Sequence, residues 1–195
     1  TLYGTRQDLR HEAGTLRFGA NLVIKDAVSG TPSGMLITHT KGLVNSVNES
    51  SPSLIFEGQN TFSGGLTLNR QSGLVNPSIS WNFYINGSSE LNTPGDLSSG
   101  IKSGPLGTGK FSTSSGTYDY LRAYNDKHYT IHNEIAPGAS YFSFGGGGSL
   151  TFDSLNPIVM GTKVHYIYSS AFSGEAIVFK SKVDASAQQL GILSG

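Results

Sequence analysis

The sequence predicts an all-β domain, an antiparallel β-sandwich or jelly roll, and two observations carry that prediction. Residues 78–85 read SISWNFYI, with large apolar side chains at Ile79, Trp81, Phe83 and Ile85. Successive side chains of a strand point to opposite faces, so this period of two is typical of a half-buried strand. Similar short runs recur between Gly, Ser, Pro and Asn residues, and almost nothing in the chain has helical periodicity.

The expected strands follow in chain order, each bounded by turn residues. Residues 15–25 alternate at Leu16 and Phe18, and the turn sequence DAVSGTPSG leads from them to residues 35–40, so that the two runs are expected to form a hairpin. The other predicted strands are residues 43–47, 53–57, 66–70, 78–85, 117–124, 129–135, 140–144, 149–152, 158–168 and 176–183.

The connections between these strands favour antiparallel pairing. They contain turns and no crossover helices, which argues against a parallel α/β enzyme. No internal repeat of about 20 to 50 residues is visible, which argues against a propeller or a solenoid. We expect one domain over residues 1–195, with an N-terminal junction at residues 1–14 and a C-terminal tail at residues 184–195.

Residues 86–116 differ from the rest in composition. They are rich in Gly, Ser, Thr and Pro, with a few apolar residues, Leu91, Leu97, Ile101, Leu106 and Phe111. This pattern predicts a long loop or a pair of weak edge strands. Long loops in compact domains are commonly functional, so the segment is a candidate contact region.

The charge balance limits the function. Charged residues make up 13% of the chain, and 13 basic residues balance 13 acidic ones. A neutral, hydroxyl-rich surface argues against binding nucleic acid or an anionic membrane, and it suits a protein that works outside cells. The absence of cysteine excludes thiol chemistry, and no apolar run reaches the roughly 18 residues of a membrane span.

No motif predicts catalysis or a cofactor. The run Gly104–Phe111, GPLGTGKF, resembles a P-loop, but Phe111 stands where the magnesium-binding hydroxyl belongs, so we interpret it as a glycine-rich turn. His128, Thr130, His132 and Glu134 would share one strand face, with Tyr129 and Ile131 in the core; residues four apart on a strand lie about 13 Å apart, too far to hold one metal ion easily. The carboxylates are scattered, and no pair for glycoside hydrolysis is evident.

The densest aromatic cluster offers a candidate binding site. Tyr118, Tyr120, Arg122 and Tyr124 alternate along one predicted strand. Tyr and Arg are enriched at binding hot spots, so contact of these four residues with a receptor or ligand competes with a second interpretation. Packing in the core or between subunits is the alternative interpretation.

About the first 45 residues resemble the opening of an adenovirus fibre head, or of a related viral or phage attachment-fibre head. The carrying residues are the run TLYGT at Thr1, the strand LVIK at Leu22, and LITHTKG at Leu36. In that family a TLW-type entry precedes a strand pair of the form LTLVLTKNGG and its return strand; here Tyr3 replaces the Trp. The resemblance implies an antiparallel sandwich that trimerises at the tip of a shaft, joined through residues 1–14, and binds a cell-surface receptor.

These observations together predict a non-enzymatic, homotrimeric attachment head of a viral fibre, which binds a host cell-surface protein or glycan through exposed loops. It would lie on the virion surface, with passage through the host nucleus during assembly if adenoviral. No metal, cofactor, nucleic acid or membrane insertion is expected. The alternatives are a capsid shell or protruding domain, and a carbohydrate-binding module.

Overall fold

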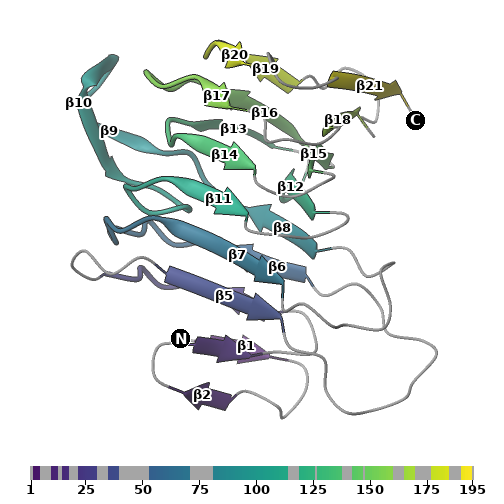
Figure 1. Ribbon diagram of the computed structural model, residues 1–195. Coiled ribbons are helices and arrows are strands. Elements are labelled where there is room, and N and C mark those ends of the chain that lie inside the picture. The colour runs from purple at the N-terminus through teal and green to yellow at the C-terminus, as the bar shows by residue number, and fades with distance from the viewer. Residues whose placement is uncertain are drawn as a thin grey trace.

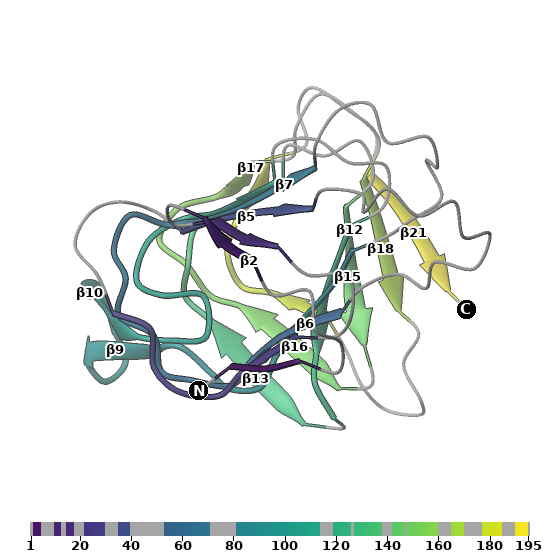
Figure 2. The same ribbon diagram turned by 90° about the horizontal axis from the view of Figure 1, so that it is seen from below.

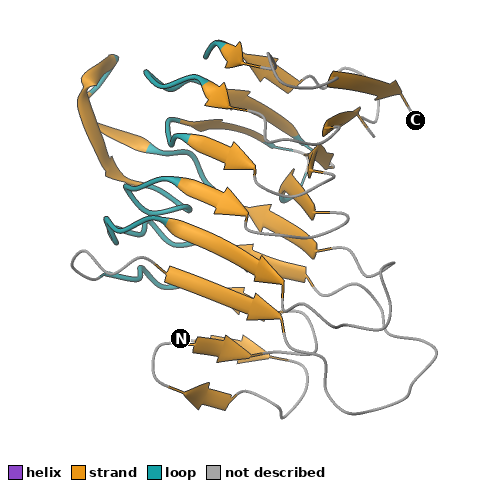
Figure 3. Cartoon of the chain, in the orientation of Figure 1, coloured by secondary structure: helices purple, strands orange, loops and turns teal. Residues whose placement is uncertain are grey.

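A computed structural model gives the fold of the protein. It describes residues 2–4, 10–12, 15–17, 22–29, 35–39, 53–70, 81–113, 119–125, 127–137, 142–146, 148–159, 165–169, 177–184 and 190–194. Strands and turns account for the secondary structure of these residues, and none of them lies in a helix (Figure 3). The prediction of an all-β protein is confirmed.

The largest sheet has eight strands in the order β1-β4-β6-β8-β12-β15-β18-β21. They are β1 (Leu2–Gly4), β4 (Leu22–Ile24), β6 (Ser53–Phe56), β8 (Trp81–Ile85), β12 (Asp119–Ala123), β15 (Phe142–Gly146), β18 (His165–Ser169) and β21 (Leu190–Ser194). Every neighbouring pair from β4 to β21 is parallel, and β1 is antiparallel to β4.

The other sheets are smaller and also mostly parallel. The six-stranded sheet contains β14 (Ile135–Pro137), β11 (Phe111–Thr113), β7 (Leu66–Arg70), β5 (Met35–His39), β3 (Thr15–Arg17) and β2 (Arg10–Glu12). A three-stranded sheet contains β13 (His128–Ile131), β16 (Ser149–Phe152) and β19 (Ile177–Phe179), and a two-stranded sheet pairs β17 (Ile158–Val159) with β20 (Val183–Asp184). Within these sheets only β2 and β3 pair antiparallel.

The chain visits the sheets in rotation and so winds into stacked coils. After β12 it passes through β13 and β14 in two other sheets and returns beside β12 as β15. The next two coils repeat this path through β16 and β17 to β18, and through β19 and β20 to β21. Figure 1 shows the coils one above another, and Figure 2 shows the sheets bordering a shared interior. The described strands form a parallel β-solenoid.

This arrangement corrects the predicted antiparallel sandwich or jelly roll. Among the described strands, antiparallel pairing is confined to β1 with β4, β2 with β3, and a hairpin of β9 (Glu90–Thr93) and β10 (Asp96–Ser103). The expected hairpin between residues 15–25 and 35–40 does not form, since β4 pairs with β6 while β5 pairs with β3 and β7. In the described parts of the crossovers the chain runs through strands and turns of the other sheets, and none of these residues lies in a helix.

The prediction that the chain is not a solenoid is also wrong. It was based on the absence of an internal repeat, and the repeat is hidden because the coils differ in length. Register aligns Leu54, Phe83, Leu121 and Phe144 in one line across the largest sheet. Phe83 and Leu121 are 38 residues apart, whereas Leu121 and Phe144 are 23 apart. A varying interval leaves no fixed period in the sequence, although the backbone returns to the same place.

Large apolar side chains fill the interior line by line. Leu54, Phe83, Leu121 and Phe144 are fully buried, and the rings of Phe56 and Phe83 stack at 5.2 Å between centroids in adjacent coils. Rings also meet across sheets: Phe83 lies 5.5 Å from Phe111 of β11. Each coil therefore packs against its neighbours along the stack and across the interior.

The predicted alternation along single strands is confirmed in β8 and β13, whereas β6 and β16 each bury three consecutive residues. Phe83 and Ile85 of β8 are buried, with the half-buried Tyr84 between them. Tyr129 and Ile131 of β13 are buried as expected, with Thr130 half-buried between them. Ile79 and the side chain of Trp81 lie outside the described residues.

The two ends of the sequence contribute strands to the sheets. β1 and β2 fall within residues 1–14, the expected junction, and pair with β4 and β3. β21 falls within residues 184–195, the expected tail, and pairs in parallel with β18. The junction and tail therefore include parts of the stack.

Candidate functional site

The β9–β10 hairpin interrupts the path from β8 to β11 and projects from the stack (Figure 1). It lies within residues 86–116, for which a long loop or a pair of weak edge strands was predicted, and the strand pair is confirmed. β11, also in that segment, belongs to the stack, between β7 and β14.

Buried and half-buried hydrogen bonds hold the first leg of the hairpin. The Ser89 amide donates to the Thr130 carbonyl oxygen at 2.9 Å. The Ser89 hydroxyl donates to Oδ1 of the buried Asn133 at 3.0 Å and accepts from the His132 amide at 3.3 Å. The Ser88 hydroxyl accepts from the Thr130 amide at 3.0 Å. This leg is thereby fixed to the coil that contains β13.

The second leg is held by the preceding turn of the stack. Asn60 and Gly104 exchange two backbone hydrogen bonds, of 2.9 and 3.0 Å. The Ser103 hydroxyl donates to Gln59 Oε1 at 3.1 Å, and Gln59 Nε2 donates to the Ser88 carbonyl oxygen at 3.1 Å. Both legs are therefore tied to the stack and, through Gln59, to each other.

The P-loop-like run is a buried turn that leads into β11. Gly107 has φ of +74°, a conformation that glycine adopts readily. The Asn133 side-chain amide donates to the carbonyl oxygens of Gly107, at 3.1 Å, and Gly109, at 2.7 Å. Asn60 Nδ2 donates to the Pro105 carbonyl oxygen at 2.8 Å. The glycine-rich turn predicted here is confirmed; a strand follows it where a P-loop has a helix.

The hairpin tip is an exposed polar turn. The Ser98 amide and hydroxyl both donate to Asp96 Oδ1, and Asn92 Nδ2 donates to the Ser99 carbonyl oxygen at 2.7 Å. The Ser98 hydroxyl, followed by the Ser98 amide, lowers the pKa of the Asp96 carboxyl. Gly95 and Gly100, each with φ of +79°, allow the chain to turn there.

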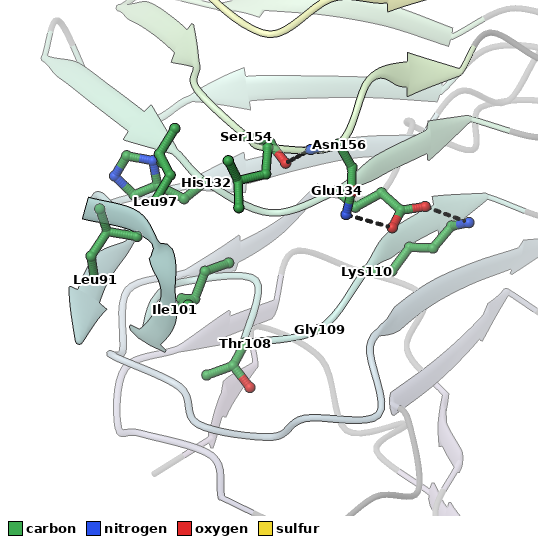
Figure 4. A pocket seen from close by; sticks show the side chains of 12 residues that line it. Leu91, Leu97, Ile101, Thr108, Gly109, Lys110, His132, Glu134, Ser154 and Asn156 are labelled. Atoms are coloured by element: carbon green, nitrogen blue, oxygen red, sulfur yellow. Dashed lines mark hydrogen bonds and ion pairs between the residues drawn. The ribbon is translucent and has the colours of Figure 1, made fainter. Parts of the chain in front are cut away.

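A hollow of about 320 Å³ lies between the hairpin and the stack (Figure 4). Leu91, Leu97 and Ile101, all half-buried, line the hairpin side. The stack side comes from residues 108–110, from the segment between β13 and β14, and from residues 154–156, where Leu155 is 65% exposed. The site thus combines four separate stretches of sequence.

A balanced group of polar side chains crosses the floor of this hollow. Lys110 Nζ lies 2.8 Å from Glu134 Oε1, and Asn156 Nδ2 donates to Glu134 Oε2 at 3.2 Å (Figure 4). Ser154 Oγ accepts from the Asn156 amide at 3.2 Å. Among the described residues that line this hollow, Glu134 is the one acidic residue. It carries a charge that Lys110 neutralises.

His132 lines both this hollow and an adjoining one. The second hollow, of about 380 Å³, is also lined by Leu91, Glu90 and Lys102, whose charged groups lie 3.6 Å apart. His132 Nδ1 lies 2.6 Å from the Asp153 carbonyl oxygen. Because a carbonyl oxygen only accepts, Nδ1 carries the hydrogen, and Nε2 is the acceptor of the neutral ring.

The predicted receptor-binding residues belong to another part of the stack. Tyr118 lies outside the described residues, and Tyr120 is in β12, opposite Asn82 and Ser143 in register. Arg122 and Tyr124 are half-buried, and the Tyr124 ring meets Tyr84 edge-on at 5.8 Å between centroids. Of their described side chains, neither Arg122 nor Tyr124 lines either hollow, and β12 lies away from the hairpin in Figure 2. Their role in binding stays a prediction.

The side chains of the predicted strand face with two histidines form hydrogen bonds or ion pairs with different partners. His128 bonds to Ser149 Oγ at 2.5 Å through Nδ1 and to Thr151 Oγ1 at 3.1 Å through Nε2. His132 bonds to Asp153, and Glu134 to Lys110. The described part of the chain contains no group of three or more His, Cys, Asp or Glu residues placed to hold a metal ion.

Sequence reasoning identified part of this site. Leu91, Leu97 and Ile101 were recognised as apolar residues of a candidate contact region, and His132 and Glu134 as neighbours on one strand face. Lys110, Ser154, Leu155 and Asn156 were missed as members of the site, and nothing in their local sequence indicates it. They meet the hairpin because parallel coiling stacks their turns at one corner.

Comparison with known proteins gives no relative for the chain: no family model, curated protein or solved structure matches it. Within the described residues, no helix is long and apolar enough to cross a membrane.

Proposed function

We propose that this chain is a non-enzymatic attachment module that binds a cell-surface receptor, in the manner of the head of a viral fibre. One observation carries the proposal: a hairpin that projects from a solenoid is fixed at its base by buried and half-buried hydrogen bonds and covers a hollow of about 320 Å³. Binding loops on a rigid scaffold are a common way to place a recognition surface.

The hairpin is poorly explained as a stabilising element. Residues 92–96 at its tip are exposed, and its apolar residues, Leu91, Leu97 and Ile101, are only half-buried. Ordering each residue costs about 1 to 2 kcal/mol of backbone entropy, which half-buried side chains offset poorly. A surface function gives a reason to keep the hairpin ordered and exposed.

The chemistry of the hollow favours binding over hydrolysis. A glycosidase needs two carboxyl groups beside the scissile bond. Each hollow has one carboxylate among its described lining residues, and each is held by a lysine: Glu134 by Lys110 at 2.8 Å, with a further bond from Asn156, and Glu90 by Lys102 at 3.6 Å. A carboxylate held by a cation and an amide is suited to accepting hydrogen bonds from a ligand.

Assembly and location follow from the resemblance to a fibre head. The antiparallel sandwich it implies differs from the observed stack, so the hairpin and the neutral surface, rather than the fold, support attachment. We retain the homotrimer at the virion surface as part of the proposal. The molar mass in solution tests it: three times 20.6 kDa is the expected value, and a strict monomer at micromolar concentration would remove the trimer.

Replacement of the hairpin tests the attachment role. Glu90 and Ser103 are direct partners in register, so an Asn-Gly turn can join them in place of residues 91–102. The base contacts of Ser89 and Ser103 remain in this variant. We expect it to keep its circular dichroism and melting temperature and to lose binding to host cells. Full binding by the folded variant would reject the hairpin as the receptor site.

A further inference from the structure

We infer that the ligand of the two hollows beside the hairpin is a neutral oligosaccharide. The inference rests on the proposed attachment function and adds the class of ligand. Its grounds are the charge balance of the hollows, their set of hydrogen-bonding atoms and the way that His132 joins them.

Charge balance excludes a strongly ionic ligand. The first hollow pairs Lys110 with Glu134 and the second pairs Lys102 with Glu90, so each contributes one cation and one anion. Recognition of phosphate, sulfate or a sugar acid calls for an excess of Lys or Arg at the site. No such excess is found among the lining residues of either hollow.

The polar atoms match hydroxyl groups, which both donate and accept. Glu134 accepts one bond at each oxygen and has lone pairs for more, and Lys110 has donors beyond the one it gives to Glu134. In its neutral form His132 adds an acceptor at Nε2, because the Nδ1 hydrogen is donated to the Asp153 carbonyl oxygen. Adjacent donors and acceptors of this kind suit neighbouring hydroxyls of a sugar ring.

The opposite wall is aliphatic. Leu97 and Ile101 line the hollow from the hairpin (Figure 4). Leu155, from the stack, also lines it. A pyranose ring has a C–H face as well as a hydroxylated rim, so a hollow with one apolar wall and one polar floor fits both. Pockets that fix ligand orientation commonly combine apolar walls with a few polar groups.

The two hollows adjoin, and this indicates more than one sugar unit. Leu91 and His132 line both, and the volumes are similar, about 320 and 380 Å³. Each offers an ion pair and a hydroxyl-compatible surface. A ligand made of similar neutral units, with His132 near the junction, uses both hollows in the same way.

The test is a glycan array that holds neutral and anionic oligosaccharides, probed with the intact chain and followed by calorimetry with the best neutral ligand. We expect neutral ligands to bind, with affinity nearly constant between about 0.05 and 0.5 M NaCl because no net charge is involved. Preference for anionic glycans, or a steep loss of affinity with salt, would overturn the inference.

A matched pair of lysine variants locates the site. Lys110 and Lys180 are both exposed and each joins one carboxylate, at 2.8 and 3.8 Å, but only Lys110 lines a hollow. Lys110→Gln is expected to weaken binding about 10-fold, the equivalent of about 1.4 kcal/mol, and Lys180→Gln to leave it unchanged. Leu155→Asp provides a second variant. It should fold normally, because the Leu155 side chain is exposed, and it should bind the ligand poorly. Equal affinities for all of these would place the ligand elsewhere.

Enzymatic removal of glycans from host cells separates this inference from the function on which it rests. Loss of binding after removal supports both. Binding that survives removal overturns the oligosaccharide and indicates a protein receptor, leaving attachment intact. No binding of the intact chain to any cell or glycan would reject both.

Discussion

The hydroxyl of Ser89 donates a hydrogen bond of 3.0 Å to the side-chain oxygen of Asn133, and both residues are buried. Ser89 begins the hairpin, whereas Asn133 lies between β13 and β14. The side-chain nitrogen of Asn133, Nδ2, also donates hydrogen bonds to the Gly107 and Gly109 carbonyl oxygens. One side chain thus joins the entry of the hairpin to the turn that follows it.

Asn133→Ala is expected to lower the free energy of unfolding by about 2 to 4 kcal/mol. The change removes three hydrogen bonds and leaves buried carbonyl oxygens without this partner, at about 1 to 3 kcal/mol for each unsatisfied group before relaxation. Urea unfolding followed by circular dichroism measures it. Asn92→Ala, at an exposed position of the hairpin, is the control; similar losses for the two variants would contradict the role assigned to Asn133.

Two glycines of the hairpin region provide a matched test of close packing. Gly95 and Gly107 have φ of +79° and +74°, so alanine is strained at both. A Cβ at Gly95 meets nothing within 4 Å, whereas one at Gly107 would lie 2.5 Å from Cε2 of Phe62. Gly95→Ala should cost about 1 kcal/mol, and Gly107→Ala substantially more. Thermal unfolding compares them, and equal melting temperatures would mean that the turn can move away from Phe62.

Phe83→Ala tests the interior line of the largest sheet. Phe83 is fully buried and stacks on Phe56 in the adjacent coil, so truncation leaves a cavity that several coils share. The expected loss is about 3 to 5 kcal/mol. Val178→Ala, at a side chain 37% exposed, should change stability by less than about 1 kcal/mol. Chemical denaturation at equilibrium distinguishes the two.

The raised pKa of the Tyr129 phenol predicts a loss of stability at alkaline pH. Burial, with a smaller contribution from the charge of Glu57, raises the pKa of its phenol above 10.0. The unfolded chain then releases this proton at a lower pH than the folded one, so stability falls as pH rises above about 10. Unfolding free energies at pH 9 and 11 should differ less in Tyr129→Phe. The variant also loses the hydrogen bond to Asn86, and this loss lowers stability at both pH values. The change in unfolding free energy between pH 9 and pH 11 is therefore the quantity that tests the prediction.

The lowered pKa of Asp96 predicts the opposite pH dependence for the stability of the hairpin tip, which is lost at low pH. Hydrogen bonds from Ser98 lower the pKa of the Asp96 carboxyl below 3.8. The ionised form is favoured when folded, so its contribution to the turn is present above about pH 4 and declines as the pH falls through the lowered pKa. NMR titration of the carboxyl in the intact protein and in Ser98→Ala measures this: the variant should titrate at higher pH. Identical titrations would show that Ser98 has no such effect.

The sequence predicts the local structure better than the pairing of strands. Phe83 and Ile85 fix which face of β8 is buried, because side chains alternate on any strand. That alternation is the same for parallel and antiparallel neighbours, so the direction of pairing depends on connections instead. Here the connections are strands of other sheets and coils of unequal length, and neither has a distinctive sequence signal.

The candidate site was predictable only in part for a related reason. Residues 86–116 stand out by composition, and the hairpin lies among them. Lys110, Glu134 and Asn156 lie about 20 residues apart along the chain, and parallel coiling brings them within hydrogen-bonding reach. Their proximity depends on the pitch of the stack, which local patterns do not encode.

The unequal spacing of Phe83, Leu121 and Phe144 has a consequence for how such a chain changes over time. Only the aligned positions must recur in the stack. A connecting segment between two of them can therefore lengthen without disturbing the strands of the sheet that it joins. The segment that contains β9 and β10 is one of these. New specificities can arise there by exchange of one excursion, while the scaffold beneath keeps its shape.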